Sequence, residues 1–309
     1  MNAFVVNRSD RGKLLLTGTE VADFLQGQVT NDVLALTEGT GCYAAFLTPK
    51  GKMLGDLRIF DAGPAGVFVD CERVVLQDLF KMIRRFKLGR DVEVHKRTLE
   101  RGLLSIIGEH RVDGPEHTHR LEDGVRLIAT DLGTDVVCDA EELEAVKARL
   151  GLPEGTAEDA EVVRVESGRP RYGVDLDDTV IPQEAGLNER AVSFEKGCYV
   201  GQETVARLFY RGKPNRRLLG LRSDAPLAPG TELSRDGKVV ARVTSSVVSP
   251  TFGPIALAFV RREVEVGASL DGVEVVELPF AEPAAVTRAT QPSTSSAGSS
   301  STAHSIRAT

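Results

Sequence analysis

The sequence is poor in the residues that mark several common classes of protein. It has no tryptophan, and aromatic residues make up only 5% of its 309 residues. No apolar run reaches the roughly 18 residues that a transmembrane helix requires, so no membrane span is predicted. The four cysteines form no C-x-x-C pair, which argues against a zinc site or a disulfide framework. Since the first residues resemble neither a signal peptide nor a transit segment, we expect a cytoplasmic protein.

Histidine and excess positive charge are also scarce. The net charge of −7 argues against nucleic-acid binding by charge alone, and no direct nucleic-acid contact is expected. Two of the five histidines stand together in His117-Thr118-His119. This segment lies among polar residues, Gly and Pro, without a cysteine nearby. We therefore interpret it as a solvated loop and predict no metal site.

Helical and strand patterns alternate over about the first 215 residues. Residues 72–87 show the clearest helical spacing of apolar side chains. Residues 41–48 and 53–60 are predicted as strands on either side of a turn, with Gly51 and Lys52 at the hairpin tip. Strands with helices crossing between them, on an apparently antiparallel sheet, indicate an α+β body of the split βαβ kind.

The pattern of predicted secondary structure changes after residue 215. Short strand patterns separated by Pro-Gly, Asp-Gly and Gly-Pro turns, without helices, predict a small C-terminal β-barrel. From residue 281 the chain consists mainly of Ser, Thr, Ala and Pro, which is typical of disorder. The predicted division is therefore an α+β body at 1–215, in two halves, a barrel at 216–280 and a disordered tail at 281–309.

An acidic residue, Asp56, stands well inside the second strand of the predicted hairpin. Burying a carboxylate without a partner costs several kcal/mol or more. Either that face of the strand is solvated, or Asp56 has a function.

The stretch from residue 195 to residue 204 places Cys198 between Gly197 and Gly201, just before an amphipathic run. This pattern predicts a loop that leads into a helix. The helix dipole and the adjacent Lys196 would both favour a thiolate. The alternative is a small buried cysteine with a packing role only.

Residues 196–203, KGCYVGQE, closely resemble the signature of the YgfZ family of folate-binding proteins, which is related to the glycine cleavage T protein, an aminomethyltransferase. The similarity extends over residues 5–275, with LTGTEVADFLQGQVTNDV, RVESGRPRYGVDL and IPQEAGL as further matching segments. The resemblance implies two ferredoxin-like α+β halves and a C-terminal barrel, arranged as a ring around a folate pocket.

The resemblance also implies functional residues. Asp56 matches the second of two acids near the reactive nitrogens of folate, whereas Gly55 replaces the first. Tyr43 matches an aromatic residue that packs on the folate, and Glu166 matches the acid that holds the pterin ring. A solvated charge at a helix end is the alternative for Glu166. Cys198 and Asp56 are the candidate catalytic residues, and the remaining candidates for folate contact share the signature: Lys196, Gly197, Tyr199, Gly201, Gln202 and Glu203.

The function that the resemblance implies is binding of tetrahydrofolate or a derivative, in support of the assembly, maintenance or repair of iron–sulfur enzymes. These clients include enzymes that modify tRNA. Two alternatives stay open: a folate-dependent aminomethyltransferase or demethylase, with Asp56 as general acid or base, and a scaffold that binds no folate. A single cysteine in the signature is too few to hold a cluster.

Overall fold

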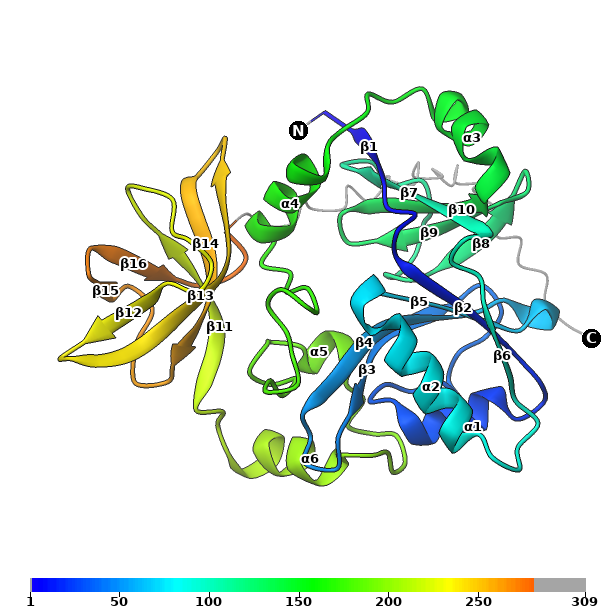
Figure 1. The fold of residues 1–309 in the computed structure, drawn as a ribbon, viewed down its shortest axis with the longest axis horizontal. Helices are drawn as coiled ribbons and strands as arrows, with labels where there is room; N and C mark the ends of the chain where they lie inside the picture. Colours follow the sequence, from blue (N-terminus) through cyan, green and yellow to red (C-terminus); the bar gives the residue numbers. More distant parts are fainter. Residues whose placement is uncertain (1, 281–309) are drawn as a thin grey trace, which may run out of the picture.

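The computed structural model of the chain describes residues 2–280, so the predicted tail at 281–309 lies outside the described residues. Within this range, no helix combines the length and apolar character needed to cross a membrane. Three antiparallel sheets and six α-helices make up the structure, with the barrel on one side and the two other sheets on the opposite side (Figure 1).

The first sheet contains the hairpin that the sequence predicts. Its strands follow the order β3 (Gly41–Leu47), β4 (Met53–Asp61), β5 (Val67–Cys71), β2 (Gly12–Thr17) and β6 (Glu93–Lys96). Two helices, α1 (Val21–Gln28) and α2 (Leu76–Phe86), lie on one face (Figure 1) and share an apolar core with it. Gly51 and Lys52 lie in the turn between β3 and β4, as predicted.

The second sheet takes its first strand from the start of the chain. Its order is β1 (Phe4–Asn7), β7 (Arg101–Ile107), β10 (Gly133–Asp139), β9 (Val125–Thr130) and β8 (His119–Glu122), with α3 (Leu143–Leu150) packed on it. Because β1 continues into β2 of the first sheet, the two sheets are tied together. An apolar cluster also joins them: Phe60, Phe68, Leu103, Ile128 and Val137.

A mostly irregular segment connects these sheets to the barrel. Helix α4 (Ala157–Glu166) begins with a capping box, in which Thr156 and Asp159 exchange hydrogen bonds. It packs against the barrel strands β13 and β14. Two further helices follow, α5 (Asn188–Ala191) and α6 (Gln202–Arg211). The segment therefore runs through the middle of the molecule before the barrel begins (Figure 1).

The barrel is a six-stranded sheet with its own apolar core. Its order is β12 (Glu232–Arg235), β13 (Lys238–Ser249), β14 (Gly253–Arg261), β11 (Arg216–Arg222), β16 (Val273–Val276) and β15 (Ser269–Leu270). The end strands β12 and β15 contact each other, so the sheet is nearly closed. The predicted fold class, α+β with a C-terminal barrel, is confirmed. The exact domain boundaries stay a prediction.

Candidate functional site

Asp56 and Tyr43 face the interior of the molecule as a hydrogen-bonded pair. Asp56 lies in β4 and is 7% exposed, which rules out the solvated alternative. The Tyr43 hydroxyl donates to its Oδ2 from the neighbouring strand β3. Burial raises the pKa of Asp56 to about 6, although the hydrogen bond from Tyr43 opposes the rise. Asp56 is therefore a carboxyl group that can take up and release a proton near neutral pH.

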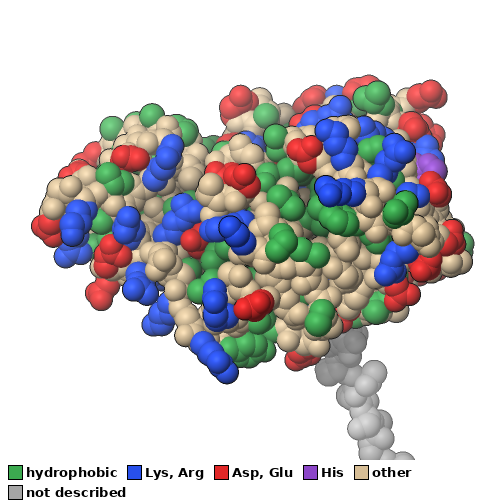
Figure 2. All heavy atoms as spheres, turned by 60° about the horizontal axis from the view of Figure 1, so that its bottom comes forward, with side chains coloured by type: hydrophobic (Ala, Val, Ile, Leu, Met, Phe, Trp, Pro, Cys, Tyr) green, Lys and Arg blue, Asp and Glu red, His purple; other side chains and the backbone are tan. Residues whose placement is uncertain are grey.

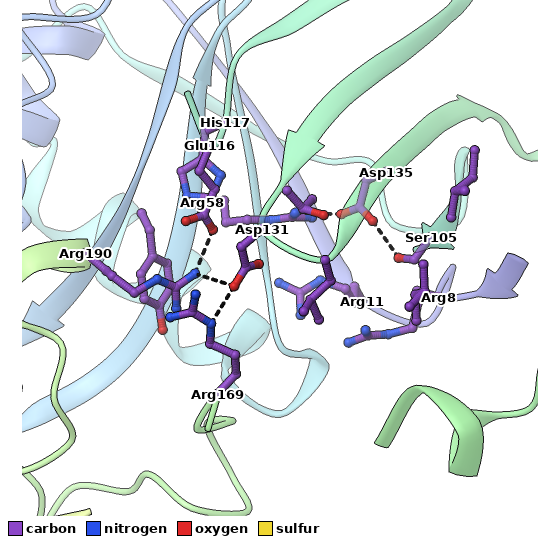
Figure 3. A pocket seen from close by; sticks show the side chains of 15 residues that line it. Arg8, Arg11, Arg58, Ser105, Glu116, His117, Asp131, Asp135, Arg169 and Arg190 are labelled. Atoms are coloured by element: carbon purple, nitrogen blue, oxygen red, sulfur yellow. Dashed lines mark hydrogen bonds and ion pairs between the residues drawn. The ribbon is translucent and has the colours of Figure 1, made fainter. Parts of the chain in front are cut away.

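Tyr43 also lines a cavity of about 170 Å³ between the first two sheets. Figure 3 shows the charged side chains around it, which the sequence analysis did not identify as a site. They come from β4, from the loop between β1 and β2, from the second sheet and its loops, and from the central segment: Arg8, Arg11, Arg58, Glu116, Asp131, Asp135, Arg169 and Arg190. The Arg190 guanidinium lies 5.5 Å from the centre of the Tyr43 ring, a cation–π distance.

A buried ion-pair network supports one wall of this cavity. Asp70, in β5, is completely buried and accepts hydrogen bonds from both Arg11 and Arg58. Arg58 also donates to Asp135 of the second sheet, over 2.6 Å. Since Arg58 links carboxylates of two sheets, the network fixes the position of one half of the body against the other.

The structure corrects the interpretation of His117 and His119 as a solvated loop. Both side chains are buried, at 6% and 3% exposure. His119 begins strand β8, and Arg126 donates to its Nδ1. The centres of both rings lie 5.5–6.0 Å from the centre of the Phe60 ring, in T-shaped geometry. These contacts join residues that are distant in the sequence, so the local polar composition could not predict the burial.

Glu166 lies at the C-terminal end of α4, against the barrel. It is 6% exposed, so the alternative of a solvated helix-end charge is wrong. Its Oε1 accepts a hydrogen bond of 2.6 Å from Ser249 of β13. Among the described residues, Oε2 has no hydrogen-bond partner. One carboxylate oxygen of Glu166 thus remains free of hydrogen bonds within the protein, but Glu166 does not line the cavity beside Tyr43.

Lys196 fixes its own loop in place. Its ammonium donates to three backbone carbonyls at the end of α1 and beyond: Gln26, Val29 and Asn31. Burial lowers the pKa of Lys196 to about 8. These contacts use all three N–H donors of the ammonium, so they hold the loop in place. None of them reaches Cys198, so they give no hydrogen-bonded support to a Cys198 thiolate.

Cys198 lies on the surface, four residues before α6 begins. The predicted loop leading into a helix is thus confirmed, and the alternative of a buried packing cysteine is wrong. Tyr199, by contrast, is buried in the apolar cluster between the body and the barrel. Gln202 and Glu203 occupy the first turn of α6, where Glu203 is exposed. Neither residue contacts Tyr43 or Asp56 through a hydrogen bond or an ion pair.

Gly201 allows α6 to approach the tip of the hairpin. It caps the helix with φ at +86°, a backbone conformation that favours glycine. A Cβ atom at this position would lie 2.5 Å from the Thr48 carbonyl oxygen and 3.2 Å from Gly51 Cα. Gly197 has a different environment, because a Cβ atom there would meet no atom within 4 Å.

The two glycines of the signature make a matched pair for mutation. We expect Gly201→Ala to lower the free energy of unfolding by about 2–4 kcal/mol, through backbone strain and the clash with the hairpin. Gly197→Ala should change it by less than about 0.5 kcal/mol. Chemical denaturation of both variants measures the difference, and equal effects would contradict the assigned role of Gly201.

The structure thus gathers only part of the predicted site in one place. Tyr43 and Asp56 lie together beside the charged cavity, whereas Glu166 lies at the barrel and Cys198 on the surface. Lys196 is linked to Tyr43 through Asn31, which accepts from Lys196 and donates to the Tyr43 carbonyl. In residues 2–280, no group of three or more His, Cys, Asp or Glu side chains is arranged to hold a metal. The roles of the individual residues stay predictions.

Comparisons with known proteins agree with this architecture. The family model of the glycine cleavage T-protein C-terminal barrel domain matches residues 216–287. The tRNA-modifying protein YgfZ of Yersinia enterocolitica is 27% identical, over 78% of this chain and 81% of its own length. An aminomethyltransferase of Corynebacterium jeikeium is 26% identical, over 88% of this chain and 82% of its own length.

The fold itself has a counterpart among solved structures. The glycine cleavage system aminomethyltransferase T of Bartonella henselae superposes with a TM-score of 0.80, at 20% identity, over 91% of this chain and 87% of that protein. The resemblance identified from residues 196–203 is therefore confirmed. The chain is similar to the YgfZ proteins over most of its length, and it has the fold of the glycine cleavage T protein, including the C-terminal barrel.

Proposed function

We propose that the protein binds tetrahydrofolate or a derivative and supports the assembly, maintenance or repair of iron–sulfur enzymes, including enzymes that modify tRNA. The observation that carries the proposal is the buried Asp56–Tyr43 pair beside a cavity. A carboxyl group held there by a tyrosine can form a charge-assisted hydrogen bond with a nitrogen of a reduced folate. The bound folate would supply a carrier for one-carbon units.

Glu166 gives independent support for folate binding. The edge of a pterin ring presents N–H donors, and a buried carboxylate with one free oxygen is an acceptor for them. In this proposal Glu166 orients the pterin ring, Tyr43 packs on the folate, and Asp56 holds or releases a proton near its reactive nitrogens. Iron–sulfur proteins are the expected partners, with no direct contact to nucleic acid or membrane.

The surface and the cysteines are compatible with this role. All four cysteines are free, which suits a reducing compartment such as the cytoplasm. On the face of the molecule drawn in Figure 2, Lys and Arg side chains alternate with acidic and hydrophobic ones, without a continuous basic field. We propose that a client protein meets Cys198, because this thiol is exposed beside α6.

A strain that lacks the gene for this chain provides the test for Cys198. We expect Cys198→Ala to lose the ability to restore iron–sulfur enzyme activity, including that of tRNA-modifying enzymes, while the variant folds normally. Cys42→Ala is the matched control, because Cys42 is half-buried in β3, and it should restore activity. Full restoration by Cys198→Ala would contradict a functional role for this thiol.

A second candidate function is transfer of a one-carbon group from an amine to folate, as in an aminomethyltransferase or demethylase. The pKa of Asp56, raised by burial to about 6, favours it, since general acids and bases work best when their pKa is near the working pH. Gly55, in place of a second acid, argues against it. Turnover of an aminomethyl donor by the purified protein with tetrahydrofolate would favour this second function over the first.

A further inference from the structure

Arg8 is the one guanidinium of the charged cavity whose charge is poorly compensated. Its nearest carboxylate oxygen, on Glu72, is 3.6 Å away, and Glu72 is also bound by Arg11. The Arg8 side chain donates no hydrogen bond to another described residue, and it lines the cavity (Figure 3). Burial and the neighbouring Arg11 charge lower the pKa of Arg8. Such a cation favours a bound anion.

The acids of the cavity do not compensate Arg8, because each is held by other groups. Asp131 pairs with Arg169 and Arg190, Glu116 with Arg190, and Asp135 with Arg58 and Ser105. These pairs neutralise the other guanidinium groups of the cavity, together with Asp70 for Arg11 and Arg58. Arg8 is then left with Glu72 alone, and it shares that carboxylate with Arg11.

Three buried nitrogen atoms of this cavity also lack a hydrogen-bond partner among the described residues: Arg11 Nε, Arg169 Nε and His117 Nδ1. Of these, Arg169 Nε has an ion-pair partner in Asp131. Burial, reinforced by the Arg58 and Arg190 charges, lowers the pKa of His117 to about 3, so its ring is neutral and carries one N–H. His117 also adopts φ of +75°, which is rare outside glycine and often accompanies a functional site. Arg11 Nε therefore requires an acceptor and His117 Nδ1 a hydrogen-bond partner, and the described residues supply neither.

We propose that the cavity is a carboxylate subsite, in which Arg8, Arg11 and His117 hold the glutamyl tail of the folate. This assignment rests on the proposed function. A carboxylate is planar, accepts two hydrogen bonds at once and matches a guanidinium in shape and charge. The volume of about 170 Å³ suits one part of a ligand, since pockets that enclose whole drug-sized molecules measure about 300–1,000 Å³.

Room for the rest of the ligand exists next to this subsite. A second cavity, of about 530 Å³, shares Arg8, Ile107 and Leu132 with the first. Arg8 therefore lies at the junction of the two spaces. With its tail at this junction, a folate would place its ring system at the Tyr43 edge of the smaller cavity.

Anaerobic calorimetric titration with two pteridines tests the assignment. Tetrahydrofolate carries the glutamyl tail, and tetrahydropteroate is the same ring system without it. We expect the wild-type protein to bind tetrahydrofolate at least about 10-fold more tightly, the usual effect of one charged hydrogen-bonded contact. Arg8→Gln should weaken tetrahydrofolate binding by about 10-fold and leave tetrahydropteroate binding unchanged.

Two further variants complete the experiment. Arg235→Gln removes an exposed charge on β12 of the barrel and should change neither affinity. His117→Asn introduces a residue that also tolerates a positive φ. It should weaken the binding of tetrahydrofolate and leave the binding of tetrahydropteroate unchanged. Equal affinities of the wild type for both pteridines, or equal weakening of both by Arg8→Gln, would overturn the subsite. Binding of neither pteridine would contradict the proposed function and the glutamyl assignment together.

Discussion

Asp70→Asn is expected to lower the free energy of unfolding by about 3–5 kcal/mol, the usual cost of removing one member of a buried ion pair. Asp70 is fully buried, and its carboxylate serves both Arg11 and Arg58, whose side chains are only 14% and 12% exposed. An amide leaves both guanidinium groups without adequate negative charge. The network also joins the two halves of the body through Asp135, so the loss should be global. Urea denaturation measures it.

Asp139→Asn is the matched control for this experiment. Asp139 ends β10 and pairs with Arg101, but both side chains are exposed, at 59% and 44%. Such a pair contributes about 0–1 kcal/mol. A loss of similar size in the two variants would contradict the importance assigned to the buried network.

The pH dependence provides an internal check on Asp70. Burial opposes its ionisation, but the Arg58 and Arg11 charges outweigh burial and hold the pKa of Asp70 well below its usual range. A carboxyl whose folded-state pKa is depressed stabilises the fold above the unfolded-state pKa of about 4. The difference between wild type and Asp70→Asn should therefore be fully present at pH 7 and should shrink as the pH falls below about 4.

Asp56→Asn is expected to have the opposite effect on stability and to impair function. Burial raises the pKa of Asp56 to about 6 in the folded state, above its value in the unfolded chain. Its ionisation therefore destabilises the fold increasingly between about pH 4 and pH 6, and fully above that range. We expect the variant to be about 3 kcal/mol more stable than the wild type at pH 8 and nearly equally stable at pH 4. Thermal unfolding across this pH range measures the effect.

The same Asp56→Asn variant should bind tetrahydrofolate more weakly, by about 10-fold or more, if the carboxyl group meets the folate nitrogens. Asp78→Asn is the control, because Asp78 lies on α2 with 81% of its side chain exposed. It should alter neither stability nor binding. An Asp56→Asn protein that is less stable at pH 8, or that binds folate as the wild type does, would contradict the assigned role.

The elements that the sequence predicted correctly depend on local patterns. The hairpin tip at Gly51, the helix predicted over residues 72–87 and the short strands of the barrel each follow from spacing and turn residues within a few positions. In the structure, the α-helix covers 76–86 and a 3₁₀ turn precedes it. The pairing of β1 with β7 is different, because it joins residues about 100 positions apart. No local pattern specifies such a pairing, so the tie between the two halves became visible only in the structure.

The charged cavity escaped prediction for a similar reason. Arg8, Arg58 and His117 come from separate segments, and each alone has the sequence environment of an ordinary surface residue. One signal was available: Asp56 and Arg58 lie on the same side of a strand whose other side is apolar, and Asp70 pairs with Arg58 across β4 and β5. A repeated charge on one side of a mostly buried strand indicates a polar interior face. Asp56 and Cys198 stood out from their local sequence, and the resemblance to a known family assigned them roles and added Glu166; none of these steps required knowledge of which residues lie close together.

Calorimetric titration of the wild-type protein with tetrahydrofolate tests the central claim most directly. The account predicts saturable binding of one molecule per chain, weakened by Asp56→Asn and unaffected by Asp78→Asn. Glu166→Gln should also weaken it, since the free carboxylate oxygen would be lost from the buried end of α4. Absence of any saturable heat from a folded sample would contradict folate binding and favour a scaffold role.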